Sequence, residues 1–423
     1  MKIGLISFHS LYSPGGVKRH VLGLSKEFRK RGISCKIVAP RRKRKERYGK
    51  NIILMGTSFP LPFSGAISDL GVNFNPLAIE RTLRKEKFNV LHFHNFGFPS
   101  TLQIFSSPAT SDTLNILTFH ANIEKNKFLK RFPLLMFLCN KICQWKIDGI
   151  IGVAPLNLKY FKNYSGPKIV IPNGIDLEVF NPKVPKIERF DNGKINILFL
   201  GRIEERKGLI YLLKAYKILT KKFSNLRLII VGEGPLKKDL ENWVKIDKLK
   251  TEPPRSGSEG GKEGKPSLTN VIFEGKVEQE KAPAYYASCD IFCSPAIFGE
   301  SFGLVLTEAM ACGKPVVAFA NEGYKTVLKG KGAKFLVKPK DYKTLAKKLE
   351  ILIKNEKLRK EMGKWGIEEA KKYSWQKITD RVLDFYQFCQ ENKKKKNKRN
   401  NLSFEEIIGK IYKNNFLPWL KLK

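Results

Sequence analysis

The stretch Gly299–Ala318, GESFGLVLTEAMACGKPVVA, holds the local pattern that decides the fold. The apolar run Gly303–Cys312 predicts a short buried helix, because Gly313 followed by Lys-Pro is typical of a helix end. The run Val316–Phe319 then fits a buried strand. A buried helix followed at once by a buried strand is the repeating unit of a layered α/β protein.

The same alternation extends toward the N-terminus. Short apolar runs predict buried strands at Ile3–Phe8, Cys35–Ala39, Val90–Phe93, Asn115–Phe119 and Gly149–Val153. Longer runs with helical spacing lie between them, at Val17–Arg31, Pro76–Glu86, Lys127–Lys146 and Pro155–Lys162. Strands that alternate with helices predict a parallel sheet covered on both faces.

A second series of the same kind follows the Pro- and Lys-containing linker Asn181–Gly193. Its expected strands are Ile195–Leu200, Leu226–Val231, Val271–Phe273, Ile291–Cys293, Val316–Phe319 and Lys334–Val337. Its expected helices are Leu209–Lys222, Leu236–Lys248, Gly303–Ala311 and Asp341–Ile353. The predicted fold class is therefore α/β, with two Rossmann-like doubly wound domains that face a cleft.

The predicted domain boundaries follow these two series. Residues 1–180 form the first domain and residues 194–375 form the second, with a flexible insert at 251–268 that is rich in Gly, Ser, Pro and charge. A helix over 376–392 is expected to cross back to the first domain. Residues 393–423 are expected to form a basic amphipathic tail.

The charge balance points to an anionic partner. The chain has 423 residues and a net charge of +40, from 79 Lys and Arg against 39 Asp and Glu, which favours an acidic membrane surface or nucleic acid. Seven cysteines without a C-x-x-C pair are typical of a reduced, cytoplasmic chain. No apolar run approaches the roughly 18–20 residues that span a bilayer.

Two glutamates, Glu300 and Glu308, flank the start of the predicted helix at Gly303. The N-terminus of a helix offers free N–H groups and a positive dipole end, which suit a phosphate. Carboxylates beside it can accept hydrogen bonds from sugar hydroxyls, so the stretch favours a sugar–diphosphate site. The alternative is structural, with one glutamate facing solvent and the other in a salt bridge.

Two further loops follow strands of the predicted sheets. In GRIEERKG, residues 201–208, Arg202 and Lys207 can both lean toward a diphosphate, or they can be ordinary surface cations. In the first domain, Gly15 and Gly16 follow the first strand and permit close approach of the backbone to a ligand.

All five histidines lie in the first 120 residues, several of them at strand ends: His9, His20, His92, His94 and His120. His92, His94 and His120 are a possible metal-ligand set, but no carboxylate or cysteine completes it at suitable spacing. No Asp-x-Asp occurs in the chain. The charge of a diphosphate would then be neutralised by cations and a helix dipole, so no metal and no cofactor are expected.

At these residues the chain resembles the retaining glycosyltransferases of family 4, which have two Rossmann-like domains (the GT-B fold). The resemblance rests on the Glu-x7-Glu pair Glu300 and Glu308, on GRIEERKG and on PNGID, and it covers roughly residues 1–390. PGGVKRHV, LTFHA and GESFGLVLTEAMACG look most like the phosphatidylinositol mannosyltransferases of bacteria.

The resemblance implies a role for each matching residue. It implies that Glu300 holds the hydroxyls of the transferred sugar, that Glu308 holds the ribose, and that Arg202 and Lys207 bind the diphosphate and stabilise it as it leaves. His120 is expected beside the reacting face of the sugar. The resemblance also implies a donor-binding set that includes Gly16, Val277, Phe302, Gly303 and Leu304, and an acceptor side with Gly15, Gly16 and His20.

One loop departs from the family pattern. Many relatives have Gly-Gly-x-Pro-Glu where this chain has Asn321–Lys325, NEGYK. That loop often touches the sugar or phosphate in the family, so the resemblance leaves the donor open between a mannose and a glucose nucleotide.

The acceptor side carries a basic and apolar segment, Lys127–Lys146. It can dip one face into a bilayer, or it can be a core helix with a basic edge. The basic runs Arg41–Lys45 and Lys393–Arg399 favour an acidic membrane. Nucleic acid is not expected, because the aromatic residues are not interleaved with the basic runs as a stacking platform requires.

The expected activity is thus transfer of a sugar from a nucleotide-sugar donor to a lipid acceptor, by an enzyme peripheral to the cytoplasmic face of a membrane. A soluble or cell-surface glycan acceptor and a nucleotide-sugar 2-epimerase are the alternatives within enzymes. A basic nucleic-acid-binding module is the alternative outside them, and it leaves the pair Glu300 and Glu308 without a role.

Overall fold

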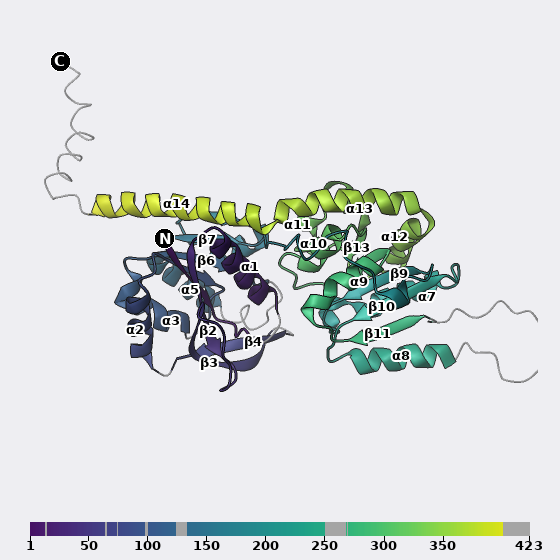
Figure 1. Ribbon diagram of the computed structural model, residues 1–423, viewed down its shortest axis with the longest axis horizontal. Coiled ribbons are helices and arrows are strands. Elements are labelled where there is room, and N and C mark those ends of the chain that lie inside the picture. The colour runs from purple at the N-terminus through teal and green to yellow at the C-terminus, as the bar shows by residue number, and fades with distance from the viewer. Residues whose placement is uncertain are drawn as a thin grey trace, which may run out of the picture.

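The computed structural model describes residues 1–12, 15–63, 66–73, 75–97, 100–123, 133–249, 268 and 270–400 (Figure 1). The predicted insert, except Leu268, lies outside the described residues, as do residues 127–132 of the predicted basic segment and residues 401–423 of the predicted tail.

The first domain is built on a sheet with the strand order β4-β3-β2-β1-β5-β6-β7-β8 in the described part of the chain. The strands are β1 Lys2–Ser7, β2 Ser34–Arg41, β3 Ile52–Phe63, β4 Ala66–Val72, β5 Val90–His94, β6 Leu114–Phe119, β7 Gly149–Gly152 and β8 Lys168–Val170. All neighbours pair in parallel except β3 and β4, which form an antiparallel edge.

Helices cover both faces of this sheet. They are α1 Gly16–Lys30, α2 Pro76–Glu86, α3 Ser100–Phe105, α5 Pro133–Lys146, α6 Pro155–Leu158 and, from the C-terminal end, α14 Trp375–Asn400. Apolar residues of α1 and α14 share one core with the sheet, while α2, α3 and α5 contribute to the core on the other face. Burial on both faces explains why the central strands of this sheet are mostly apolar in the sequence.

The second domain has a parallel sheet with the order β11-β10-β9-β12-β13-β14. Its strands are β9 Ile195–Leu200, β10 Leu226–Val231, β11 Val271–Gly275, β12 Ile291–Ser294, β13 Val316–Phe319 and β14 Leu336–Val337. Its helices are α7 Leu209–Leu219, α8 Lys237–Leu249, α9 Ala282–Ser288, α10 Leu304–Ala311, α11 Tyr324–Val327, α12 Tyr342–Lys354 and α13 Glu356–Ala370. Two mainly parallel sheets, each between helices, confirm the predicted α/β fold class.

The chain passes between the domains at two adjacent places. Ile175, on the way out, pairs with Ser374, on the way back, and its N–H donates to the carbonyl of Tyr373 at 2.8 Å. A Cβ on Gly174 would lie 2.4 Å from the indole of Trp375, so this crossing needs a glycine. From Trp375 helix α14 runs back along the first domain, beside α1 and above β6 and β7 (Figure 1).

The local pattern failed at a few elements. It missed β3 and the edge strand β4, because β3 contains Gly56, Pro60 and Pro62, which normally interrupt a strand. The two prolines lie beyond Thr57, where β3 pairs with β4 and no longer with β2. It also missed helices α3, α9, α11 and α13. The strand predicted at Lys334–Val337 is shorter, because residues 330–335 form a 3-10 turn and only Leu336 and Val337 pair.

Candidate active site

Helix α10 begins where the two domains meet. Gly303 caps it with a φ of +119°, and a Cβ there would lie 2.8 Å from the ring of Tyr324, so the turn into the helix requires glycine. Glu300 stands in the loop before this turn and Glu308 on the second turn of the helix, as the sequence predicts. The free N–H groups at the start of α10 therefore lie between the two carboxylates.

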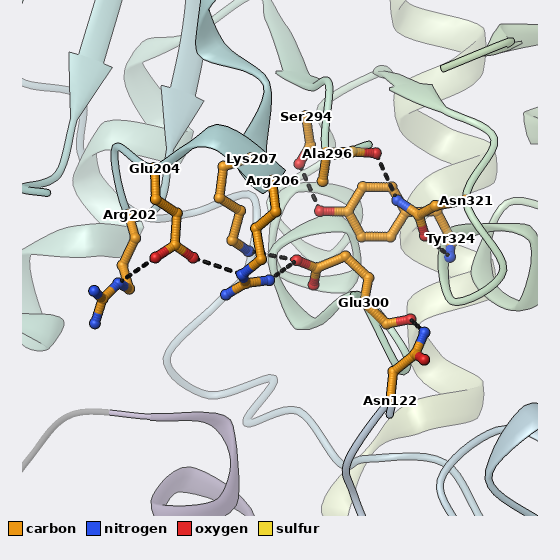
Figure 2. Close-up of polar contacts among 10 residues, drawn as sticks. All are labelled: Asn122, Arg202, Glu204, Arg206, Lys207, Ser294, Ala296, Glu300, Asn321 and Tyr324. Atoms are coloured by element: carbon orange, nitrogen blue, oxygen red, sulfur yellow. Dashed lines mark hydrogen bonds and ion pairs between the residues drawn. The ribbon is translucent and has the colours of Figure 1, made fainter. Parts of the chain in front are cut away.

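Glu300 is held by two cations from one turn of the chain. The 3-10 turn Glu205–Lys207 follows β9, and both Arg206 Nη1 and Lys207 Nζ donate to Glu300 Oε1, at 2.9 and 2.7 Å (Figure 2). Burial opposes the ionisation of Glu300, but the nearby Lys207 and Arg206 outweigh it and lower the pKa of this carboxyl. Glu300 is therefore an ionised carboxylate in a nearly buried site.

Arg202 lies on the far side of a second buried carboxylate. Its Nε donates to Glu204 Oε2 at 3.0 Å, while Arg206 Nε lies 2.6 Å from Glu204 Oε1. Figure 2 shows Arg202 directed away from Glu300, and its side chain is 48% exposed. Of the two predicted diphosphate ligands, only Lys207 contacts Glu300, whereas Arg202 belongs to the same network through Glu204.

The sequence interpretation missed Arg206 and Glu204. Both lie inside GRIEERKG, next to the predicted ligands Arg202 and Lys207, but the basic and acidic side chains of this motif look alike in sequence. Their signal is position, since they share the loop at the carboxyl end of β9, where a doubly wound sheet binds its ligands.

Glu308 is occupied by one partner from each domain. The hydroxyl of Tyr286 in α9 donates to Glu308 Oε2 at 2.8 Å, and Arg19 of α1 forms an ion pair with Oε1. The side chain of Glu308 is 4% exposed. Arg19 is a further functional candidate that the sequence interpretation missed, and no local pattern indicates it.

Other contacts also join the two domains at this point. Asn122 Nδ2, just after β6, donates to the backbone carbonyl of Glu300 at 3.1 Å. A Cβ on Gly16, at the start of α1, would lie 3.6 Å from Leu304 at the start of α10, and a Cβ on Gly15 would meet nothing within 4 Å. Packing within the protein therefore does not require glycine at either position.

Three histidines of the first domain, His20, His94 and His120, lie close together. His94 Nδ1 lies 3.2 Å from His120 Nε2, and the ring of His20 lies 4.7 Å from that of His120. Burial lowers the pKa of His20 to about 4, with the nearby Asn173 side chain opposing the shift, and burial lowers the pKa values of His94 and His120 well below the ordinary value. All three are neutral imidazoles near pH 7.

The metal-ligand set suggested by the sequence was wrong in one member. Among the described residues, the nitrogens of His20, His94 and His120 lie within 4.8 Å of one another, and His92 is outside the group. His92 is engaged on both sides, by Thr118 at 2.6 Å and by the hydroxyl of Tyr386 at 2.6 Å. Its ring therefore links the sheet to helix α14.

The remaining predicted donor residues lie around the start of α10 and the end of β11. Phe302 is buried and its ring lies 5.2 Å from that of Tyr373, so its side chain is directed into the protein and only its backbone can serve a ligand. Val277 is half-buried and packs against the core that also contains Leu306 and Tyr286.

The loop that departs from the family pattern supports Glu300 from behind. Asn321 Nδ2 donates to the carbonyl of Ala296 at 2.8 Å, and the hydroxyl of Tyr324 lies 2.7 Å from Ser294 Oγ (Figure 2). A Cβ on Gly323 would lie 2.5 Å from the carbonyl oxygen of Glu300. This close packing fixes the backbone that carries the carboxylate.

Known proteins resemble this chain over nearly its whole length. Residues 14–179 match the family model Glycosyltransferase Family 4, and residues 194–355 match Glycosyl transferases group 1. The phosphatidyl-myo-inositol mannosyltransferase of Mycobacterium leprae (strain TN) is 30% identical over 396 residues, which are 92% of this chain and 96% of that protein.

Solved structures share the arrangement of the two domains. The sucrose-phosphate synthase from Thermosynechococcus elongatus superposes with a TM-score of 0.70 at 19% identity, covering 93% of this chain and 100% of that one. Anabaena Alr3699/HepE in complex with UDP superposes with a TM-score of 0.66 at 16% identity, covering 91% and 99%. At these identities the likeness concerns the fold.

Proposed function

This chain belongs to glycosyltransferase family 4, and on that basis we propose that it transfers a hexose from a nucleotide-diphosphate sugar to a lipid of the phosphatidylinositol type. Mannose is the first choice of sugar and glucose the second, and the anomeric configuration is retained without a metal. The observation that carries the proposal is the ionised Glu300, held by Arg206 and Lys207 beside the start of α10. The mannosyltransferase name of the relative that is 30% identical supports the choice of sugar and acceptor.

The donor would lie across the start of α10. The diphosphate suits the free N–H groups at that helix start, with Lys207 and Arg202 as cations. Glu300 would accept hydrogen bonds from the sugar hydroxyls, and Glu308 from the ribose. Negative charge that develops on the departing diphosphate would be stabilised by groups already in place, which is the largest catalytic term in many enzymes.

The acceptor would enter from the first domain. His120 and Asn122 lie on the same loop after β6, and Asn122 contacts the backbone of Glu300. His120 would therefore be brought to the reacting face of the sugar, where a neutral imidazole can accept a hydrogen bond from an acceptor hydroxyl. Gly15, Gly16 and His20 lie on the same side.

Helix α5 supports a membrane-bound acceptor. One of its faces is buried through Cys139 and Cys143, while Phe137, Leu138 and Trp145 are 45, 47 and 71% exposed. Lys146 Nζ lies 4.3 Å from the centroid of the Trp145 ring. Exposed aromatic rings beside cations are suited to the headgroup region of an anionic bilayer. Helix α5 thus combines features of both alternatives from the sequence, because one face is packed in the core and the other is exposed, basic and apolar.

In this proposal the protein would bind at the surface of the bilayer. None of the helices in the described part of the chain is long and apolar enough to cross a membrane. The basic run at Arg41–Lys45 adds further cations on the first domain.

The proposal is tested by a transfer assay on vesicles of phosphatidylinositol and phosphatidylcholine. Labelled GDP-mannose, GDP-glucose, UDP-glucose and UDP-mannose are supplied one at a time. Label that enters the lipid phase with one donor supports the proposal and identifies the sugar. Label that remains in water contradicts the lipid acceptor, and conversion of a donor to its 2-epimer without any acceptor would favour an epimerase.

The membrane surface is tested separately by sedimentation with the same vesicles. The double variant Phe137→Ser with Trp145→Ser is compared with Ile351→Ser, which removes a 45% exposed apolar side chain from α12 in the second domain. We expect weaker vesicle binding for the double variant alone. Equal binding of the wild type and both variants would show that α5 does not touch the bilayer.

A further inference from the structure

Two cations share one oxygen of Glu300, and they are anchored differently. Arg206 is fixed at three points, because its carbonyl accepts from the N–H of Ile297 at 2.7 Å, its Nε contacts Glu204, and its Nη1 contacts Glu300. Lys207 reaches Glu300 through a single flexible ammonium, which lies 2.7 Å from Oε1.

Glu204 is the residue that aims Arg206. Its side chain is 5% exposed and stands between Arg202 and Arg206 (Figure 2). Its own carbonyl accepts from the N–H of Lys207 at 3.0 Å, so the turn that carries both cations is closed on Glu204. The guanidinium of Arg206 therefore lies between two carboxylates, with Nε in an ion pair with Glu204 and Nη1 donating to Glu300.

Because Arg206 and Lys207 are anchored differently, they are suited to different roles. An incoming diphosphate attracts the cation that can move, which is Lys207. Glu300 would then keep one cation, and a nearly buried carboxylate that loses all its partners becomes costly to keep ionised. The residue that stays must therefore be the one with its own support.

We infer that Arg206 and Glu204 are positioning residues of this site: Glu204 fixes Arg206, and Arg206 holds the Glu300 carboxylate in place for the sugar while Lys207 moves to the diphosphate. This inference rests on the proposed donor site and is independent of the acceptor. It assigns no contact with the substrate to Glu204.

The test measures donor binding by calorimetry, so that no acceptor is needed. GDP-mannose and UDP-glucose are compared with GDP and UDP, and the ratio of the two dissociation constants gives the contribution of the sugar. The variants are Arg206→Gln, Arg206→Lys and Glu204→Gln. The matched control is Glu205→Gln, which removes the same charge from an exposed neighbour in the same turn.

We expect Arg206→Gln to reduce the contribution of the sugar about tenfold or more, with a smaller loss for Glu204→Gln and partial rescue in Arg206→Lys, because these changes remove or weaken a charge-assisted hydrogen bond. Binding of the free nucleotide should change little. The control should bind the donor as the wild type does.

A pH series separates positioning from a general structural defect. Among the described residues, the titratable groups that face Glu300 are Arg206, Lys207 and Tyr324, and the first two keep its carboxyl ionised. Without Arg206, Glu300 should become protonated at a higher pH. The acid limb of donor binding, which is the pH range in which binding weakens as the pH falls, should therefore lie at higher pH in Arg206→Gln. A defect of folding alone would weaken binding without moving that limb.

Three outcomes decide the inference. An unchanged sugar contribution and an unmoved acid limb in Arg206→Gln would overturn it. Failure of the wild type to bind any of these nucleotides would overturn both the donor site and this inference. Normal donor binding without transfer to lipid would overturn the proposed acceptor alone.

Discussion

Arg19 of helix α1 pairs with Glu308 of helix α10, and the two residues belong to different domains, 289 positions apart. The pair covers the carboxylate proposed to hold the ribose. Because that side chain is 4% exposed, a nucleotide that uses Glu308 must displace Arg19 or share the carboxylate with it. In the proposed function, the contact between the domains would therefore be linked to occupancy of the donor site.

We predict that Arg19→Gln binds GDP or UDP more tightly than the wild type. Removing the competing partner raises the fraction of protein in the binding-competent state, which should lower the apparent dissociation constant by about threefold to thirtyfold. Lys18→Gln, which removes the neighbouring cation of α1, is the control. Weaker binding in Arg19→Gln would show instead that Arg19 helps to hold the nucleotide.

Replacing Gly303 should lower the stability of the protein as well as disturb the site. At a φ of +119°, with the ring of Tyr324 only 2.8 Å from the position of an added Cβ, Gly303→Ala combines backbone strain with a clash. We expect a loss of about 2 kcal/mol in the free energy of unfolding, measured by urea denaturation. A Cβ on Gly49 meets no atom within 4 Å, so Gly49→Ala should leave stability nearly unchanged.

The histidine cluster should make the fold sensitive to acid. The pKa of His20 falls from 6.5 to about 4 on folding, so the unfolded chain binds the proton first as pH falls. The contribution of His20 to the free energy of unfolding is fully present above pH 6.5. It decreases by about 3 kcal/mol as the pH falls from 6.5 to 4. Denaturation curves at pH 7 and pH 5 should differ less for His20→Gln, and an equal difference would argue against a buried neutral His20.

The same cluster provides a test of metal dependence. His20, His94 and His120 have the spacing of a possible metal set, yet the proposed chemistry uses the cations near Glu300. We predict that transfer in the vesicle assay is unchanged after dialysis against EDTA. Loss of activity that Zn²⁺ or another divalent ion restores would assign the cluster a catalytic metal.

Much of the fold could be predicted from local pattern, because its central strands are buried on both faces. The bounds of β9 and β10 agree with the prediction to the residue, since each is an apolar run with a single polar residue, Asn196 or Arg227, between polar turns. Strand β3 and the edge strand β4 could not be found in this way, because their antiparallel pairing joins two segments that both contain turn residues.

The residues of the candidate site can be divided in the same way, into those that a local pattern indicates and those that only the packing brings together. Glu300 and Lys207 were found because they belong to short motifs at strand and helix ends. Arg19 was missed because its partner is 289 residues away, and His20 replaced His92 in the histidine group because helix α1 folds onto the ends of β5 and β6. Such contacts depend on how the elements pack, which spacing along the chain does not encode.

The most direct measurement compares the wild type with Glu300→Gln in the vesicle assay, with the donor that labels lipid best. Glu322→Gln, an exposed glutamate of the neighbouring loop, is the control. We predict that Glu300→Gln folds normally and transfers at least about 100-fold more slowly, because it loses a charged hydrogen-bond acceptor at the reacting sugar. Label in the lipid at the wild-type rate from Glu300→Gln would contradict the assignment of this site to sugar transfer.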